Sequence, residues 1–205
     1  MAAWLKAFLL LVGILVLGMV VAFLWIGSRG ISARAEPSAV ETAIARTMRR
    51  LAVPRGDRDR VNPVKPTSEV LADGMAHYAD HCAACHANDG SGETELGLGL
   101  YPRPPDMRQK STQSLTDGEL FYIIQNGVRL TGMPAWDTGT PDGDTSTWHL
   151  VHFIRRLPTL PENELEEMKG LNPRSRGEIQ QEIEEEKFLQ GGDATPSPPP
   201  ATHEH

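Results

Sequence analysis

The sequence predicts an all-α protein in which one apolar helix precedes a small helical domain. An uncharged run at residues 7–26 is long enough to form a helix across a bilayer core. Further along the chain, apolar residues recur at helical spacing, and Ser or Thr residues that can cap a helix precede some of these segments. The predicted divisions are an anchor at 1–28, a short helix and linker at 29–66, the domain at 67–158, and an acidic extension with a partly disordered tail at 159–205.

Length and charge limit the function classes. A chain of 205 residues has room for one domain of about 100 residues with extensions. Its formal net charge of −7 argues against a nucleic-acid partner, because nucleic-acid binding requires a basic surface.

The apolar run Ala7–Ile26 predicts one membrane anchor. Trp4 and Trp25 lie at its two ends, as aromatic residues do at membrane interfaces. A cleaved signal peptide is the alternative, and Ala33-Arg34-Ala35 offers a cleavage site of the A-x-A type. The run is longer than a signal h-region of about 7–15 residues, so a retained helix is favoured.

Residues 37–51 predict a short amphipathic helix with three arginines beside its apolar positions. It is either a spacer that packs lightly on the domain or a docking helix whose basic residues meet lipid phosphates. Pro54 through Pro66 predicts a linker by its composition.

Cys82, Cys85 and His86 form the spacing C-x-x-C-H, which is the attachment signature of a c-type haem. Each thiol can form a thioether to one vinyl group of the porphyrin, and the adjacent imidazole can ligate the iron. These are the chain's two cysteines. A redox dithiol would require a βαβ context, and a closed zinc site would require four protein ligands.

Met133 is the candidate for the second axial ligand, because methionine paired with histidine is an arrangement of electron-transferring cytochromes. It lies in the non-helical turn Gly132-Met133-Pro134, whereas other methionines lie in helical, surface or apolar contexts.

Residues 68–157 resemble a class I, monohaem cytochrome c domain. The motifs that carry the resemblance are Gly74-x-x-x-Tyr78-x-x-x-Cys82-x-x-Cys85-His86, Gly132-Met133-Pro134 and Trp148-His149-Leu150-Val151-His152-Phe153-Ile154. The resemblance implies the cytochrome c fold around one covalent haem c, with His86 and Met133 as the axial pair and Gly74 facing Phe153. It also implies haem attachment outside the cytoplasm. We therefore expect the domain on the periplasmic side of a bacterial inner membrane.

The domain helices are expected from Thr67 or Ser68 to about Cys82, after a capping box of Thr116 and Glu119, and from about Thr147 to Leu157. A loop is expected at residues 137–146, and Pro158 is expected to end the domain.

Several histidines and one tryptophan are secondary candidates. His77 and His81 lie four apart and are either surface residues or metal ligands, and Trp136 is either a core residue or a neighbour of the haem. His149 and His152 are expected on the polar side of the last domain helix.

The segment 97–106 is rich in proline, and in class I cytochromes a proline carbonyl in this loop accepts a hydrogen bond from the ligating histidine. Pro102, Pro104 and Pro105 compete for this role. Arg103 is a candidate contact for a haem propionate, since arginine binds carboxylates through a planar fork, and a solvated loop arginine is the alternative.

The C-terminal part is expected to form no core of its own. Residues 177–190 predict a helix that docks a basic partner or stays solvated, and residues 191–205 predict disorder. His203 and His205 at the end of the chain could bind copper only weakly.

These observations predict a membrane-tethered carrier that moves one electron at a time between protein partners of a respiratory chain. It would catalyse no bond chemistry, because both axial positions are taken. One alternative is an anchored haem c subunit of a terminal oxidase, nitric-oxide reductase or dehydrogenase complex. The other is a haem-based redox or gas sensor, in which Met133 would be weakly bound.

Overall fold

The computed structural model of the protein describes residues 2–29, 32–174 and 176–190. These residues form helices and loops and no strand, which confirms the predicted all-α class for this part of the chain. The longer α-helices are α1 (Ala2–Arg29), α2 (Ala39–Ala52), α4 (Ser68–His77), α8 (Asp117–Asn126), α9 (Pro141–Arg156), α10 (Glu162–Leu171) and α11 (Arg176–Leu189). The short elements are α3 (Arg55–Arg58), η1 (Tyr78–Cys82), α5 (Ala83–His86), α6 (Glu95–Leu98), α7 (Lys110–Gln113) and η2 (Leu157–Thr159). The predicted disordered tail, with His203 and His205, lies outside the described residues.

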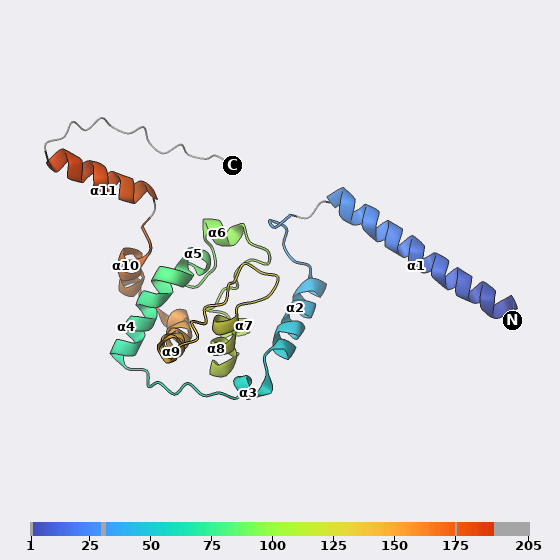
Figure 1. The fold of residues 1–205 in the computed structure, drawn as a ribbon, viewed down its shortest axis with the longest axis horizontal. Helices are drawn as coiled ribbons and strands as arrows, with labels where there is room; N and C mark the ends of the chain where they lie inside the picture. The colour runs from blue at the N-terminus through green and yellow to red at the C-terminus, as the bar shows by residue number, and fades with distance from the viewer. Residues whose placement is uncertain (1, 30–31, 175, 191–205) are drawn as a thin grey trace.

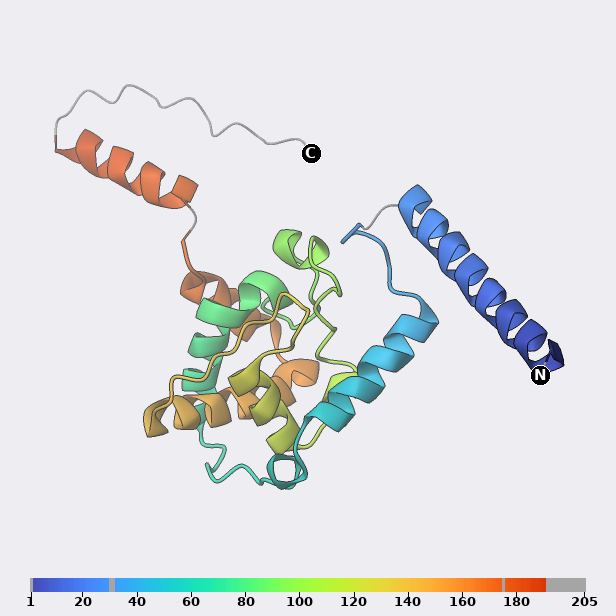
Figure 2. The same ribbon diagram turned by 45° about the vertical axis from the view of Figure 1, so that its right-hand side comes forward.

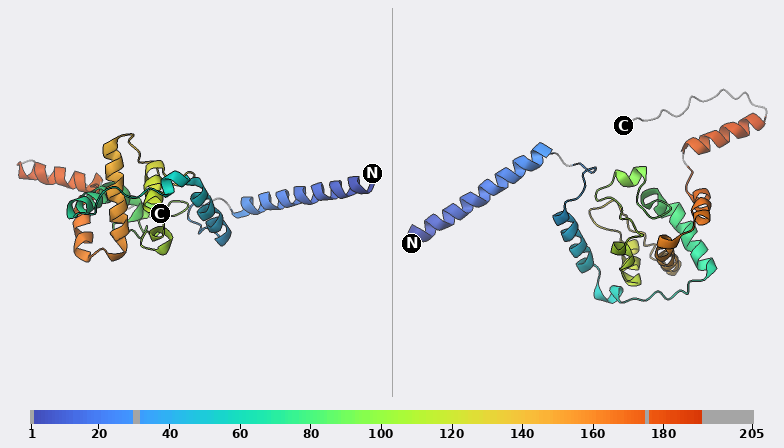
Figure 3. Two further views of the ribbon diagram at one scale, coloured as in Figure 1. Left: turned by 90° about the horizontal axis from the view of Figure 1, so that it is seen from below. Right: turned by 180° about the vertical axis from the view of Figure 1, so that it is seen from behind.

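Two helices project from the packed domain. α1 and α11 extend from opposite sides of it (Figures 1 and 3). Large apolar side chains of α1 are exposed along its length. Among the described residues, the segment Ala3–Ser28 is the one helix long and apolar enough to cross a membrane. This agrees with the predicted membrane anchor.

The core is built around the close crossing of α4 and α9. A Cβ atom added to Gly74 would lie 2.5 Å from the carbonyl oxygen of His149 and 3.2 Å from Cβ of Phe153. Only glycine allows the two helices to approach this closely without displacement. The rings of Tyr78 and Phe153 then meet with their centroids 5.1 Å apart, and both side chains are fully buried. The predicted proximity of Gly74 and Phe153 is therefore present.

Threonine side chains begin the main helices of the domain. The Thr67 hydroxyl accepts a hydrogen bond from the Val70 amide at the start of α4. Thr116 and Glu119 form the predicted capping box of α8. The predicted start of the last domain helix near Thr147 is wrong, since α9 begins at Pro141. Thr140 caps that end, and proline is well suited to the first helical turn.

The first domain helix is also divided more finely than predicted. α4 ends at His77, and one turn of π-helix, η1, connects it to α5. Single π-helical turns inside helices are often found at functional sites. Here the turn precedes the segment that carries Cys85 and His86.

The predicted linker is packed against the domain. We name residues 53–64 the strap. Its contacts are the ion pair of Arg58 Nε with Glu119 Oε1 (3.3 Å), the hydrogen bond from Asn62 Nδ2 to the Trp148 carbonyl (2.9 Å), the hydrogen bond from His152 Nε2 to the Val64 carbonyl (2.7 Å), and the Arg60 guanidinium 4.2 Å from the Phe121 ring centroid. Composition indicated a free linker here, but these partners lie far away in the sequence and were not visible from local pattern. His152 is consequently a partner of the strap.

The core continues past residue 158, where Pro158 was expected to end the domain. Met168 of α10 is fully buried in the same core cluster, and Leu160 and Leu165 pack against that cluster. Glu164 forms an ion pair with Arg156 of α9. Pro158 lies in the short helix η2, which turns the chain back toward the domain.

We expect Gly74→Ala to lower the free energy of unfolding by about 2 kcal/mol, because the added methyl group meets backbone atoms of α9 that cannot easily move. Urea unfolding followed by far-UV circular dichroism measures this change. The matched control is Gly170→Ala in α10, where an added Cβ meets no atom within 4 Å. An equal effect of the two substitutions would contradict the close crossing.

Candidate functional site

Cys82 and Cys85 lie on successive turns at the junction of η1 and α5. The Cys82 side chain packs against the core, and burial, with a further contribution from Cys85, raises its pKa to about 12. Burial also raises the pKa of Cys85. Reactive dithiols instead have a lowered pKa, so the environment of these two thiols does not favour a redox dithiol.

His86 is the last residue of α5. Its Nδ1 atom is buried and has no hydrogen-bond partner among the described residues. Burial lowers the pKa of the imidazole to about 4, so the ring is neutral at neutral pH. A neutral imidazole is the form that binds a metal. The two thiols and this unpartnered nitrogen are a donor set that fits a covalently attached haem.

The chain after His86 folds back tightly over α5. The Gly92 amide donates to the His86 carbonyl (2.9 Å), and the Thr94 hydroxyl donates to the Ala84 carbonyl (2.8 Å). Gly92 has φ +77°, and a Cβ atom there would lie 2.7 Å from the Pro104 carbonyl oxygen. Pro104, of the three candidate prolines, is thus placed against the loop that begins at His86.

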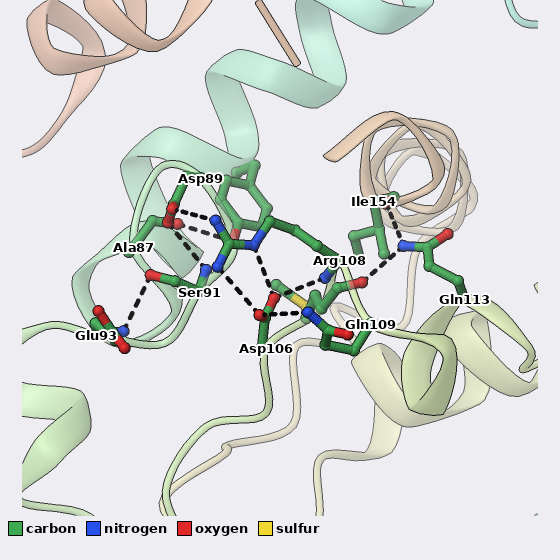
Figure 4. A network of polar contacts seen from close by, with 11 residues as sticks. Ala87, Asp89, Ser91, Glu93, Asp106, Arg108, Gln109, Gln113 and Ile154 are labelled. Carbon is green, nitrogen blue, oxygen red and sulfur yellow. Dashed lines mark hydrogen bonds and ion pairs between the residues drawn. The ribbon is translucent and has the colours of Figure 1, made fainter. Parts of the chain in front are cut away.

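Arg108, which was not among the candidates predicted from the sequence, holds this loop in place, as Figure 4 shows. The Arg108 guanidinium bonds Asp106 through two nitrogens (Nε–Oδ1 2.9 Å, Nη2–Oδ2 3.0 Å) and Asp89 through a third (Nη1–Oδ2 2.7 Å). Asp89 also accepts from the Ser91 amide (2.9 Å). The hydrogen bonds from Arg108 hold the pKa of Asp106 at about 2. The sequence feature that could have indicated this ion pair is the close spacing of Asp106 and Arg108 at the end of the proline-rich segment.

Arg103, the predicted propionate contact, lies in the same proline-rich segment. In the structure its Nη1 atom is 3.2 Å from Glu36 Oε1, in the segment between α1 and α2. About a third of the Arg103 side chain is exposed, and the carboxylate is mostly exposed. Because an exposed ion pair is weak, this pairing leaves the guanidinium able to exchange partners. Its contact with a propionate stays a prediction.

Met133 lies in a non-helical loop, as its sequence context indicated. Its amide donates to the Thr131 hydroxyl (3.1 Å), and its carbonyl accepts from the Val128 amide (3.2 Å). The side chain is half-buried and packs against the core cluster, as Cys82 does. The backbone of this loop is therefore held by its own hydrogen bonds. The role of Met133 as an iron ligand stays a prediction.

The aromatic and imidazole rings of three residues meet beside this site. The centroids of His77 and His81 are 4.9 Å apart, and those of His81 and Trp136 are 5.3 Å apart. Burial, followed by the neighbouring His81, lowers the pKa of His77. In the part of the chain that the structure describes, no group of three or more His, Cys, Asp or Glu side chains could hold a metal ion. The alternatives of a metal site at His77 and His81 and of a closed zinc site at the two cysteines therefore find no ligand set there.

Comparisons with known proteins match part of the chain. Residues 69–154 match the sequence model of the family described as cytochrome c oxidase, cbb3-type, subunit III. No curated protein matches the chain. Among solved structures, a chain of a reducing HAO-like protein complex from Kuenenia stuttgartiensis is 20% identical, with a TM-score of 0.41, and the match covers 46% of each chain.

We expect Arg108→Gln to destabilise the protein by about 1 kcal/mol at pH 6, a value reduced for the partial exposure of this ion pair. The pKa of Asp106 lies below its usual value, so the stabilisation is complete above about pH 4 and is lost as the pH falls toward about 2. Urea unfolding at pH 6 and at pH 2.5 measures both values. The exposed Arg129→Gln is the control, and a difference between Arg108→Gln and wild type that persists unchanged at pH 2.5 would contradict the assigned pairing.

Proposed function

We propose, from the c-type cytochrome domain that residues 69–154 form, that the protein is a membrane-tethered electron carrier with one covalently bound haem. The observation that carries the proposal is the site at η1 and α5. There, Cys82 and Cys85 flank one helical turn, and His86 follows with a buried, unpartnered ring nitrogen. When bound, the haem supplies an iron that gains and loses one electron reversibly.

Each residue of the site has a separate part in this proposal. Cys82 and Cys85 would hold the porphyrin through thioether bonds, and neutral His86 would provide one nitrogen ligand to the iron. Met133 would provide a thioether sulfur as the second ligand, a pairing that raises the reduction potential in cytochromes c. The packing of α4 on α9 keeps the supporting residues in place.

The Arg108 network has a positioning part. It joins Asp89, three residues after His86, to Asp106 in the proline-rich loop. Such contacts around a ligand fix its orientation and influence the metal. Pro104 is the proline that we propose as the acceptor for the His86 ring, because its carbonyl already lies against Gly92. Arg103 remains the candidate contact for a propionate, in exchange for its exposed partner Glu36.

If His86 and Met133 both bound the iron, the site would have no open position for a substrate, so we propose a carrier and no catalyst. The apolar helix α1 would hold the domain at a bacterial inner membrane, on the periplasmic side. Its partners would then be redox proteins of a respiratory chain.

A second candidate function is an anchored haem c subunit of a larger oxidoreductase complex. The matched family is described as a subunit of an oxidase, which favours this possibility. Purification in mild detergent distinguishes the two, because a subunit copurifies with stoichiometric partner chains and a carrier elutes as a monomer. A redox or gas sensor is the third possibility, and a reduced spectrum that CO leaves unchanged would contradict it.

We expect the paired substitutions Cys82→Ser and Cys85→Ser to abolish covalent haem retention, because no thiol then remains to form a thioether. Extraction of the purified chain with acidified acetone measures this, since thioether-bound haem stays with the polypeptide. Arg129→Gln, distant in sequence from the motif, should retain all of its haem. A wild-type chain that is colourless, or that loses its colour on extraction, would refute the cofactor assignment.

We expect Met133→Ala to remove the sulfur-to-iron charge-transfer band of the oxidised protein and to lower the reduction potential. Absorption spectroscopy and a redox titration measure these changes. Met48→Ala is the matched control, because Met48 is exposed on α2. Persistence of the band in the Met133 variant would refute the ligand assignment and leave the covalent attachment untouched.

A further inference from the structure

Helix α2 carries an apolar stripe that is largely exposed. Val40, Ile44, Met48 and Leu51 are each more than half exposed. Their spacing places them on one face, since an α-helix turns by about 100° per residue. A helix of a globular domain normally buries such an apolar face against other residues. In this structure the stripe is exposed instead.

The opposite face of α2 is the one that approaches the domain. Thr42 and Arg49 are less exposed than their neighbours, and Val53, the residue that follows the helix, is buried. A shallow contact surface with α8 is lined by Arg49, Arg50, Val53, Leu115, Glu119 and Ile123. The helix therefore turns a polar and basic side toward the protein and its apolar side outward, which reverses the usual arrangement. Figure 2 shows α2 along the outside of the domain.

The membrane that holds α1 is within reach of this face. Only residues 30–38 separate the end of α1 from the start of α2. Even fully extended, this segment spans at most about 30 Å, comparable to the thickness of a bilayer core. The start of α2 therefore stays within about 30 Å of the end of α1, close enough for its outward face to reach lipid if α1 spans the membrane.

The charge of α2 matches a lipid surface. The helix contains Arg46, Arg49 and Arg50 and a single acidic residue, Glu41, whereas the whole chain has a net charge of −7. Glu41 is engaged at the first turn, where it completes the capping box with Ser38. An apolar stripe on a helix that also carries basic residues is the composition of helices that lie in the interface of a membrane and are attracted by anionic lipids.

We propose that α2 lies in the headgroup region of the membrane that α1 spans, with its apolar stripe in the lipid and its basic side turned toward the domain. The occupant of the stripe is an anionic phospholipid surface. The Tyr101 hydroxyl donates to Glu41 (3.2 Å), and Arg103 pairs with Glu36, so the loop around residues 101–103 is held beside the membrane-facing helix. This inference goes beyond the proposed electron transfer and rests on the anchor, not on the haem.

The direct test uses the full-length protein in nanodiscs of phosphatidylcholine with one third phosphatidylglycerol. A keto amino acid carrying a nitroxide replaces Ile44, Met48 or Ala45 in turn, which leaves the two cysteines free for haem. Ala45 is the matched position, because it is exposed on the same helix and lies away from the stripe. Electron paramagnetic resonance power saturation should show that the labels at 44 and 48 collide mainly with oxygen, and the label at 45 mainly with a water-soluble nickel chelate. Equal aqueous accessibility at all three positions would overturn the proposal.

A second measurement avoids labels. In the same nanodiscs, Ile44→Glu combined with Met48→Glu should speed hydrogen–deuterium exchange of the α2 amides by about tenfold or more, since two aliphatic side chains lose their apolar surroundings. Ala45→Glu should leave the exchange near the wild-type rate. Identical exchange rates in the double variant and in Ala45→Glu would overturn the proposal. The proposal would also be overturned if the labels at 44 and 48 showed no lipid contact and the double variant changed the haem spectrum. Failure of the electron-carrier proposal would appear separately, as a wild-type chain without a haem spectrum.

Discussion

The contact between the backbones of α4 and α9 is the constraint on which the rest of the domain depends. At Gly74 the two helices are too close for a side chain at that position. This proximity lets Tyr78 and Phe153 share one buried layer, and it sets the direction in which the chain leaves α4. The π-helical turn and α5 follow directly, so the position of the two thiols and of His86 derives from a packing contact that itself carries no chemistry. The Tyr78 hydroxyl, which donates to the Ala87 carbonyl (3.0 Å), connects that layer to the residue after His86.

The site combines groups whose surroundings favour their neutral forms. Burial raises the pKa of both thiols and lowers that of the imidazole, so none of the three carries charge at neutral pH. The charged groups lie instead in the neighbouring loops, where Arg108 bonds the carboxylates of Asp106 and Asp89. Neutral, largely buried donor groups beside a charged loop suit a site whose chemistry depends on low polarity while the loop around it stays ordered.

The sequence predicted the features that depend on local chemistry. Thr116, and either Thr67 or Ser68, are predicted as caps because a hydroxyl before an apolar periodic segment has a defined hydrogen-bond partner within three residues. The start of α9 was placed too late because Gly143 and two aspartates resemble a loop, although Thr140 and Pro141 form a good helix start. The packing of the strap and of Met168 could not be predicted, since their partners are distant in the sequence. Arg108 was missed for a related reason, because Asp89 lies in a different loop and only the fold brings it near.

The docked strap also determines how far the domain can travel from the bilayer. If residues 30–66 were a free tether, the domain could be as far as about 120 Å from the end of α1. From residue 53 onward, however, the chain is fixed to the domain by Arg58, Asn62 and Arg60. Only residues 30–38 and the single helix α2 then connect α1 to the strap. If α1 spans a membrane as proposed, the domain therefore stays in a thin layer next to that membrane, and its encounters with a membrane-bound partner should depend on two-dimensional diffusion more than on exchange with the bulk solution.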